Sequence, residues 1–147
     1  MSFHDLLATA QQRPLTDAEL IDFNEMATGL SQYLGMRFTA VTPTSIRSEL
    51  VVSQHHLQPF GLVNGGVFAS IAETVASAAG AIVAGLPVAG INNNTHFFKS
   101  ARSGVICAET TALHVGKSTH TWQVAMTQAD RLLAQSSVQL MVLTGVN

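Results

Sequence analysis

The sequence predicts an α+β fold in which one long helix packs against an antiparallel sheet of five to six strands. Residues 67–84 form one alanine-rich run without proline, two strand-like segments precede this run, and four strand-like segments follow it after Gly90. One apolar helix among strands that succeed each other through short turns is typical of a helix layered on an antiparallel sheet.

A short helix is predicted near the N-terminus. Thr16 and Glu19 have the spacing of a capping box, in which the Thr16 side chain accepts from the Glu19 amide and Glu19 reaches back. Apolar residues follow at a loose helical period, so we expect a helix over about residues 17–28 that ends near Gly29. This helix lies in an N-terminal helical segment of about residues 1–34.

Two strands are predicted next, over residues 35–42 and 45–52. The first ends at Pro43, and the second alternates between a drier and a wetter face, which is the period of a strand. Residues 55–61 include Pro59 and Gly61, so we expect a loop there.

The central helix is predicted over residues 67–84, between the pair Gly65-Gly66 and the stop at Gly85 and Pro87. It is apolar nearly all round, so we expect it to be buried inside a wrapped sheet. The strands after it are expected at residues 91–100, 105–115, 118–128 and 132–143. The core then spans about residues 35–145, and residues 1–147 form a single domain.

The composition indicates an oligomer. Hydrophobic residues make up 47% of the chain and charged residues 11%, whereas roughly a quarter is typical of soluble domains. A monomer of this size would have difficulty hiding so much apolar surface, so we expect a homo-oligomer, with an unusually dense monomer as the alternative. The net charge of −2 and the scattered Lys and Arg residues argue against a nucleic-acid partner.

The first ten residues lack the basic start of a signal peptide, and the apolar stretch 75–91 is broken by Pro87 and is a poor membrane span. The single Cys107 excludes an internal disulfide and a cysteine-based zinc cluster, and it fits a reducing compartment. We therefore expect a cytoplasmic protein without a membrane partner.

A candidate site begins where the central helix begins. Gly65 and Gly66 permit close approach to the first helical N–H groups, which have no helical partner and carry partial positive charge. Such amides stabilise a carbonyl oxygen that gains negative charge under attack. A plain helix start after a turn remains the alternative.

Glu73 strengthens the functional interpretation. It is the only Asp, Glu, Lys or Arg between His56 and His96. At helical spacing it shares a face with Ser70 and Ser77, while Ile71, Val75, Ala78 and Ile82 lie opposite. A carboxylate in such a helix is costly unless it is paired or used. A Glu that bonds a strand hydroxyl, or lies at a helix edge, is the structural alternative.

Other chemistry has less support in the sequence. Gln58, in the loop before Gly65, has an amide that could hold a carbonyl or orient a water. The histidines lack metal-ligand spacing, so no metal and no cofactor is expected. Neither Ser70 nor Ser77 has the sequence context of a serine-hydrolase nucleophile.

These residues resemble the signature of the hotdog-fold acyl-CoA thioesterases of the 4-hydroxybenzoyl-CoA and phenylacetyl-CoA types. The resemblance covers about residues 35–142. It rests on HLQPFGLVNGGV at residues 56–67 followed by Glu73, on NTHFFKSA at residues 94–101 with Gly104, and on VGKS at residues 115–118.

The resemblance implies a helix wrapped by an antiparallel sheet, a dimer or a dimer of dimers, and active sites at the dimer interface. It implies that the Gly65 amide binds the thioester oxygen beside Gln58. Glu73 of the facing subunit attacks the carbonyl or activates water, and Ser77 orients the water or substrate. It places Asn64 and Gly66 in the substrate loop. It also offers candidates for the CoA phosphates and ribose: Arg102, Lys117, Ser118 and Thr119.

One departure from the family pattern keeps other functions open. Asn64 stands where the family commonly has His. A hotdog protein that binds acyl-CoA without catalysis is therefore an alternative, and a dehydratase of hydroxyacyl thioesters is a weaker one. The acyl group, and the choice between CoA and a carrier protein, are not specified by the sequence.

Overall fold

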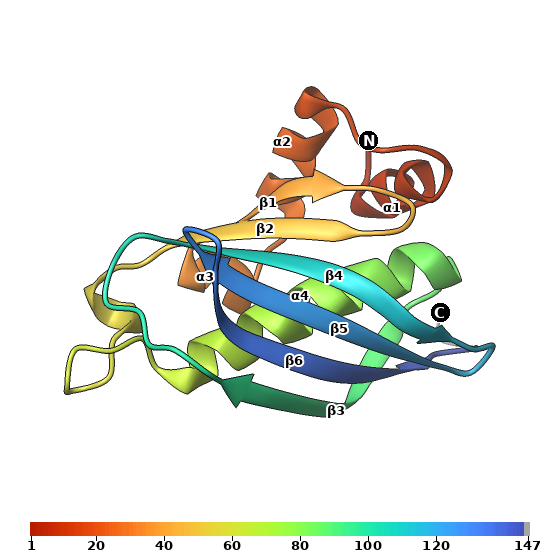
Figure 1. The fold of residues 1–147 in the computed structure, drawn as a ribbon. Helices are drawn as coiled ribbons and strands as arrows, with labels where there is room; N and C mark the ends of the chain where they lie inside the picture. Colours follow the sequence, from red (N-terminus) through yellow and green to blue (C-terminus); the bar gives the residue numbers. More distant parts are fainter. Residues whose placement is uncertain (146–147) are drawn as a thin grey trace.

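A computed structural model of the chain describes residues 1–145. Three helices precede a first pair of strands, a long helix follows, and four strands complete the chain (Figure 1). The helices are α1 (Phe3–Gln12), α2 (Asp17–Met26), α3 (Leu30–Leu34) and α4 (Gly65–Ala84). The strands are β1 (Met36–Val41), β2 (Ile46–Val51), β3 (Val88–Phe97), β4 (Val105–Val115), β5 (Thr119–Gln128) and β6 (Arg131–Val142).

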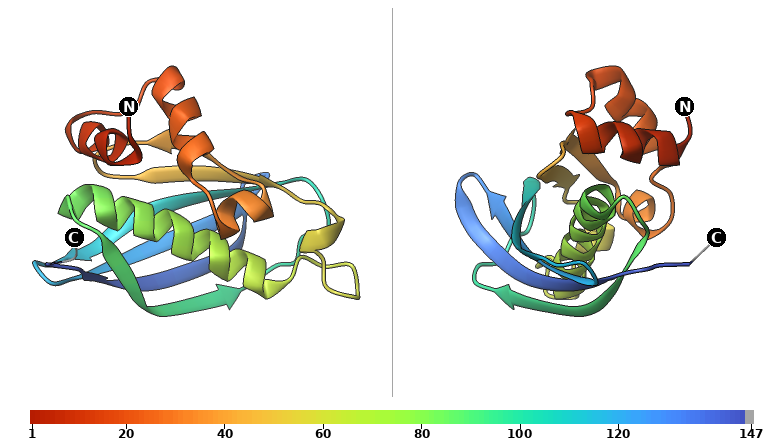
Figure 2. Two further views of the ribbon diagram at one scale, coloured as in Figure 1. Left: turned by 180° about the vertical axis from the view of Figure 1, so that it is seen from behind. Right: turned by 90° about the vertical axis from the view of Figure 1, so that its right-hand side faces the viewer.

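The strands form one six-stranded antiparallel sheet in the order β1-β2-β4-β5-β6-β3. The sheet curves around α4, and the N-terminal helices lie on the other side of this helix (Figure 2). The predicted α+β arrangement, with a long helix wrapped by an antiparallel sheet, is confirmed.

Three local predictions differ from the structure. α4 begins at Gly65 rather than Val67, because the Asn64 side chain caps it. β3 begins at Val88 rather than residue 91, because Gly90 is accommodated at an irregularity in the β3–β6 register. The expected loop at residues 55–61 is preceded by one turn of 3-10 helix, Gln54–His56.

The sheet covers only one side of α4. Ile71, Val75 and Ile82 are at most 1% exposed, whereas Glu73 and Ser77 on the other side are half-buried. The expected burial of the helix therefore holds for its sheet-facing side, while its other side is only half-buried in a single chain. Close packing on the sheet side depends on the absence of a side chain at Gly80, since a Cβ there would lie 2.5 Å from Leu140 Cδ1.

α4 also has the length and composition of a membrane span, with a mean hydropathy of 1.7. Half of its apolar 18-residue stretch is buried inside the protein. Core helices of soluble proteins have the same properties, so this feature is weak support for a membrane role.

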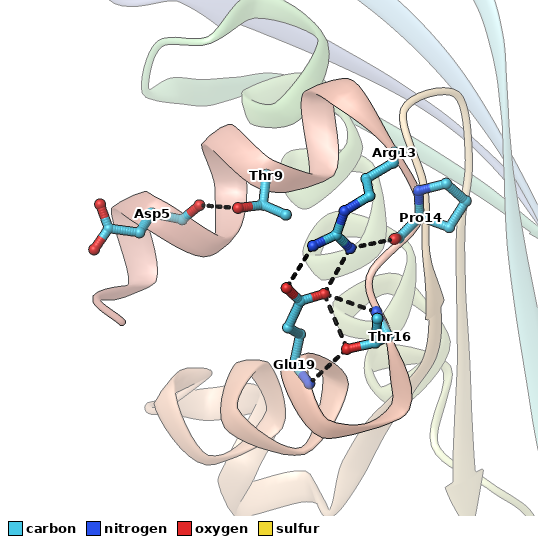
Figure 3. A network of polar contacts seen from close by, with 6 residues as sticks. All are labelled: Asp5, Thr9, Arg13, Pro14, Thr16 and Glu19. Carbon is cyan, nitrogen blue, oxygen red and sulfur yellow. Dashed lines mark hydrogen bonds and ion pairs between the residues drawn. The ribbon is translucent and has the colours of Figure 1, made fainter.

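Capping boxes define the N-terminal helices. Ser2 and Asp5 start α1, a helix that sequence analysis missed although its box is visible in the sequence. Thr16 and Glu19 form the predicted box of α2. Both guanidinium nitrogens of Arg13 also donate to the Glu19 carboxylate, at 2.8 and 2.7 Å, and so join the end of α1 to the start of α2 (Figure 3).

We predict that the packing of α1 on α2 weakens in acid. The hydrogen bonds from Arg13, and then those from Thr16, lower the pKa of Glu19 from 4.5 to about 2. The stabilisation is complete above the unfolded value and disappears as the pH falls from about 4.5 toward 2. Thermal melts across this window should show a steeper loss of stability for the wild type than for Glu19→Gln. Parallel slopes would contradict the prediction.

The two edges of the sheet differ. At β1, the Asn24 amide of α2 binds the backbone of Phe38, accepting from its N–H at 2.7 Å and donating to its carbonyl at 2.9 Å. At the other edge, no strand among residues 1–145 lies beyond β3. Exposed apolar side chains accompany this open edge: Ile91, Phe97 and Phe98. An open edge with exposed apolar residues is a template for strand pairing.

Candidate active site

The loop before α4 is held by a buried histidine. The ring of His56 is 2% exposed. Its Nδ1 accepts from the Ser53 N–H at 2.9 Å, so its Nε2 carries the hydrogen and donates to the Leu34 carbonyl at 2.6 Å. The His56 carbonyl in turn accepts from the Asn64 N–H at 2.9 Å. His56 is thus a packing residue that fixes the start of α4.

Asn64 accepts hydrogen bonds from some of the first backbone amides of α4 and leaves one of them free. Its Oδ1 accepts from the Gly66 N–H at 2.7 Å, and its carbonyl accepts from the Val67 N–H at 2.9 Å. The Gly65 N–H has no hydrogen-bond acceptor within residues 1–145. It is the amide left to bind an oxygen at this helix end, while the Gly66 amide is engaged.

The approach to Gly65 is lined by an aromatic ring. A Cβ at Gly65 would lie 2.9 Å from Cζ of Phe97, so only glycine permits this ring position. Phe97 belongs to β3 and is 56% exposed in the single chain. The free amide therefore lies beside the open edge of the sheet.

Glu73 also contacts β3, but beside Gly90 and Asn93 rather than beside Phe97. A Cβ at Gly90 would lie 2.0 Å from Glu73 Oε1, so the carboxylate occupies the space that a side chain at Gly90 would fill. Asn93 Nδ2 donates to Glu73 Oε2 at 3.2 Å and to the Ala69 carbonyl at 3.0 Å. Asn93 and Gly90 thus place the carboxylate against β3.

The orientation of the Asn93 amide is itself determined by neighbours. Thr95 Oγ1 donates to Asn93 Oδ1 at 2.8 Å, which leaves Nδ2 to face Glu73. The buried Ser136 Oγ lies 2.7 Å from Thr95 Oγ1 and supplies the hydrogen of that contact, because the Thr95 hydrogen is already used. Sequence analysis missed Gly90, Asn93 and Thr95. An isolated Gly within a strand was the only available signal.

Asn93 holds the Glu73 carboxylate, and if that carboxylate takes part in a reaction, we predict that the effect of replacing Asn93 depends on the polarity of the new side chain. Asn93→Ala should lower kcat by about tenfold with little change in KM, because one hydrogen bond to a charged group is lost. Asn93→Asp keeps the shape and the acceptor but removes the donor and adds a like charge, so it should lose more. Steady-state kinetics with thermal melts test this. A purely structural role would lower the melting temperature of both variants and give no difference between Ala and Asp.

Gly65 and Glu73 of one chain do not meet. Eight residues of α4 separate them, or about 12 Å along the helix. The strand gives a consistent separation, since Asn93 beside the carboxylate and Phe97 beside Gly65 are four residues, about 13 Å, apart. An oxygen-binding amide and an attacking group must both lie about 3 Å from the reacting carbonyl. Within a single chain, the Gly65 amide and the Glu73 carboxylate therefore cannot both reach one carbonyl.

The remaining predicted residues fall at two ends of the molecule. Gln58 lies in the turn before α4, and its side chain accepts from the Phe60 N–H. Arg102 is near this end, because a Cβ at Gly61 would lie 3.3 Å from its Nη1. Lys117, Ser118 and Thr119 lie at the β4–β5 turn, at the opposite end of α4 (Figure 1). One chain does not bring these CoA-binding candidates together.

A cavity of about 640 Å³ lies between the N-terminal helices and the open side of α4. Glu73 and Ser77, one helical turn apart, both line it. Within residues 1–145, no group of three or more His, Cys, Asp or Glu side chains could hold a metal ion. On the α4 side, the polar groups of this cavity are the Glu73 carboxylate and the hydroxyls of Thr74 and Ser77, and they lie beside an apolar space.

A helix wrapped by an antiparallel sheet, with a free amide at its start and a carboxylate two turns further, is the arrangement of a hotdog thioesterase. Residues 60–135 match the family model of the thioesterase superfamily. The chain belongs to this superfamily.

Comparisons with individual proteins also support membership of the thioesterase superfamily. The chain is 32% identical to a 1,4-dihydroxy-2-naphthoyl-CoA hydrolase of Listeria monocytogenes, over 78% of this chain and 95% of the relative. It is 31% identical to the proofreading thioesterase EntH of Klebsiella pneumoniae, over 80% and 85%. A thioesterase structure from Haemophilus influenzae superposes with a TM-score of 0.80 at 28% identity, over 87% of this chain and 92% of that one.

Proposed function

We propose that this thioesterase hydrolyses an acyl- or aryl-CoA thioester to the free acid and CoA, with Glu73 as the reacting carboxylate. The observation that carries the proposal is the pair of half-sites: a free Gly65 amide at one level of the sheet edge, and a carboxylate held by Asn93 at another. Relatives named as CoA-thioester hydrolases support CoA as the carrier. The reaction requires water and the thioester, and no cofactor.

A second copy of the chain completes the site. If two copies pair through their open β3 edges in antiparallel fashion, their α4 helices also run antiparallel, and Glu73 of one faces Gly65 of the other. The blocked β1 edge and the open β3 edge favour this pairing. The active species is accordingly a homodimer or a dimer of dimers, and light scattering tests it. An active monomer would contradict the shared site.

In the proposed reaction the Gly65 N–H binds the thioester oxygen, with Gln58 as a second amide group, and stabilises the negative charge that forms there. Glu73 acts in one of two ways. As a base, it takes a proton from water, whose oxygen bonds to the carbonyl carbon while the C–S bond breaks and the thiolate takes up the proton. As a nucleophile, its oxygen bonds to the carbonyl carbon while the C–S bond breaks and CoA leaves as the thiolate. Water then hydrolyses the mixed anhydride to the free acid and the Glu73 carboxylate, and the thiolate takes up the proton that is released. Ser77 orients the water or substrate.

The first experiment is thiol release from a panel of aryl-, short- and long-chain acyl-CoAs. Turnover of at least one of them is expected, whereas binding without release of thiol would favour the acyl-CoA-binding alternative. A single turnover in ¹⁸O-labelled water with enzyme in excess separates the two roles of Glu73. An unlabelled first product identifies the nucleophilic route with water attacking the Glu73 carbonyl of the anhydride, whereas the base route labels the product in the first turnover.

A further inference from the structure

The cavity beside Glu73 has two walls of different origin. One wall belongs to α4 and the segment after it, and includes Ser77, Ala78 and Ala81. The other wall is formed by α1, α2, α3 and β1. The family match begins at residue 60, so the second wall lies outside the matched part of the chain. The N-terminal helices and β1 thus form a second surface that faces the proposed catalytic carboxylate.

The N-terminal wall is aromatic. The Phe3 and Phe23 rings lie 5.0 Å apart between centroids, and Phe38 meets Phe23 edge-on, also at 5.0 Å. Phe23 and Phe38 are at most 3% exposed, so the cavity reaches the buried core rather than ending at a surface groove. Its volume, about 640 Å³, falls within the range of small-ligand pockets, roughly 300–1,000 Å³.

The charges of the lining residues indicate which part of an acyl-CoA the cavity can bind. Among the described residues that line the cavity, only His4 and Glu73 are titratable, and none is Lys or Arg. CoA phosphates are bound most strongly by Lys and Arg, and this lining has neither, so we expect the phosphates to lie outside the cavity. A carboxylate on the acyl group would lose hydration and meet the Glu73 charge.

We propose that this cavity binds the uncharged, apolar acyl group of the substrate, aromatic or aliphatic, and that α1 and α2 are the elements that select it. The proposal rests on the proposed thioesterase function. The acyl group enters past Glu73 and Ser77 and packs between Ala81 of α4 and Ala8 of α1, with the Phe23 ring at the inner end. The thioester carbonyl then stays at the mouth, next to the carboxylate.

The test fills the cavity from each wall. Ala81→Leu and Ala8→Leu both project a larger side chain into the cavity, and Ala84→Leu is the matched control, on the same helix but outside the lining. Both filling variants should lower kcat/KM for octanoyl-CoA and benzoyl-CoA by about tenfold or more relative to acetyl-CoA. The control should keep the wild-type ratio, and succinyl-CoA should be a poor substrate for the wild type.

Binding is measured separately with S-octyl-CoA, a thioether that cannot be hydrolysed, by calorimetry. If the wild type binds it and the filling variants do not, yet no acyl-CoA is hydrolysed, the cavity assignment stands and the thioesterase function falls. If hydrolysis is normal and the chain-length ratio is unchanged in both variants, the assignment is overturned. The assignment would also be overturned if kcat/KM of the filling variants fell equally for every acyl-CoA and their oligomeric state changed. That result would mean that a second copy of the chain, rather than an acyl group, occupies the cavity.

Discussion

Glu73→Gln is expected to lower kcat for the best acyl-CoA substrate by about a thousandfold, because loss of a carboxylate in the proposed role of base or nucleophile typically removes factors of this size. The glutamine keeps the length of the side chain and an oxygen that can accept from Asn93, so the helix and its contact with β3 are expected to persist. The measurement is the initial rate of thiol release, with KM determined in parallel.

Glu25→Gln is the control for this variant, since Glu25 is exposed on α2 and lies outside the cavity lining. It should retain wild-type kinetics. S-octyl-CoA binding by Glu73→Gln should also persist, because in the proposed complex the octyl chain packs mainly against Ala81, Ala8 and Phe23 and needs no negative charge at residue 73. Wild-type turnover in Glu73→Gln would show that another group carries the chemistry.

The second large effect is expected from a single methyl group on the neighbouring strand. In Gly90→Ala, the new Cβ would lie 2.0 Å from Glu73 Oε1, so the carboxylate must move away from its place beside Asn93. Gly90 does not have a positive φ, so alanine is compatible with its backbone. We expect kcat to fall by about a hundredfold, the size of effect that a displacement of about 1 Å produces, while the fold remains intact.

A double mutant shows whether Gly90 acts through Glu73. If it does, Gly90→Ala adds nothing to the loss already present in Glu73→Gln, because residues that act as one unit are not additive. A multiplicative loss in the double mutant would mean that Gly90 affects activity by a separate route, such as pairing of the β3 edges. Light scattering of both single variants identifies that case.

The order of the elements could be predicted from the sequence, because each depends on contacts between near neighbours. The box of Thr16 and Glu19 needs residues three apart, and the alternation of residues 45–52 needs only a period of two. α1 was missed although Ser2 and Asp5 have the same spacing and apolar residues follow at a helical period, at Phe3, Leu6, Leu7 and Ala10. Boundaries were displaced where a side chain or an irregular strand pairing decided them, as at Asn64 and Gly90.

What the sequence by itself determined is the chemistry carried by α4: a glycine pair at its start and one carboxylate in an otherwise uncharged helix. Only the tertiary structure decided how that carboxylate is held and what it serves. Asn93 and Gly90 reach Glu73 through sheet register, which depends on the whole of β3 and β6. The separation of Gly65 from Glu73 is likewise spatial: a rigid helix keeps them about 12 Å apart, too far for both to reach one carbonyl within a single chain, which is why the proposed site includes a second copy.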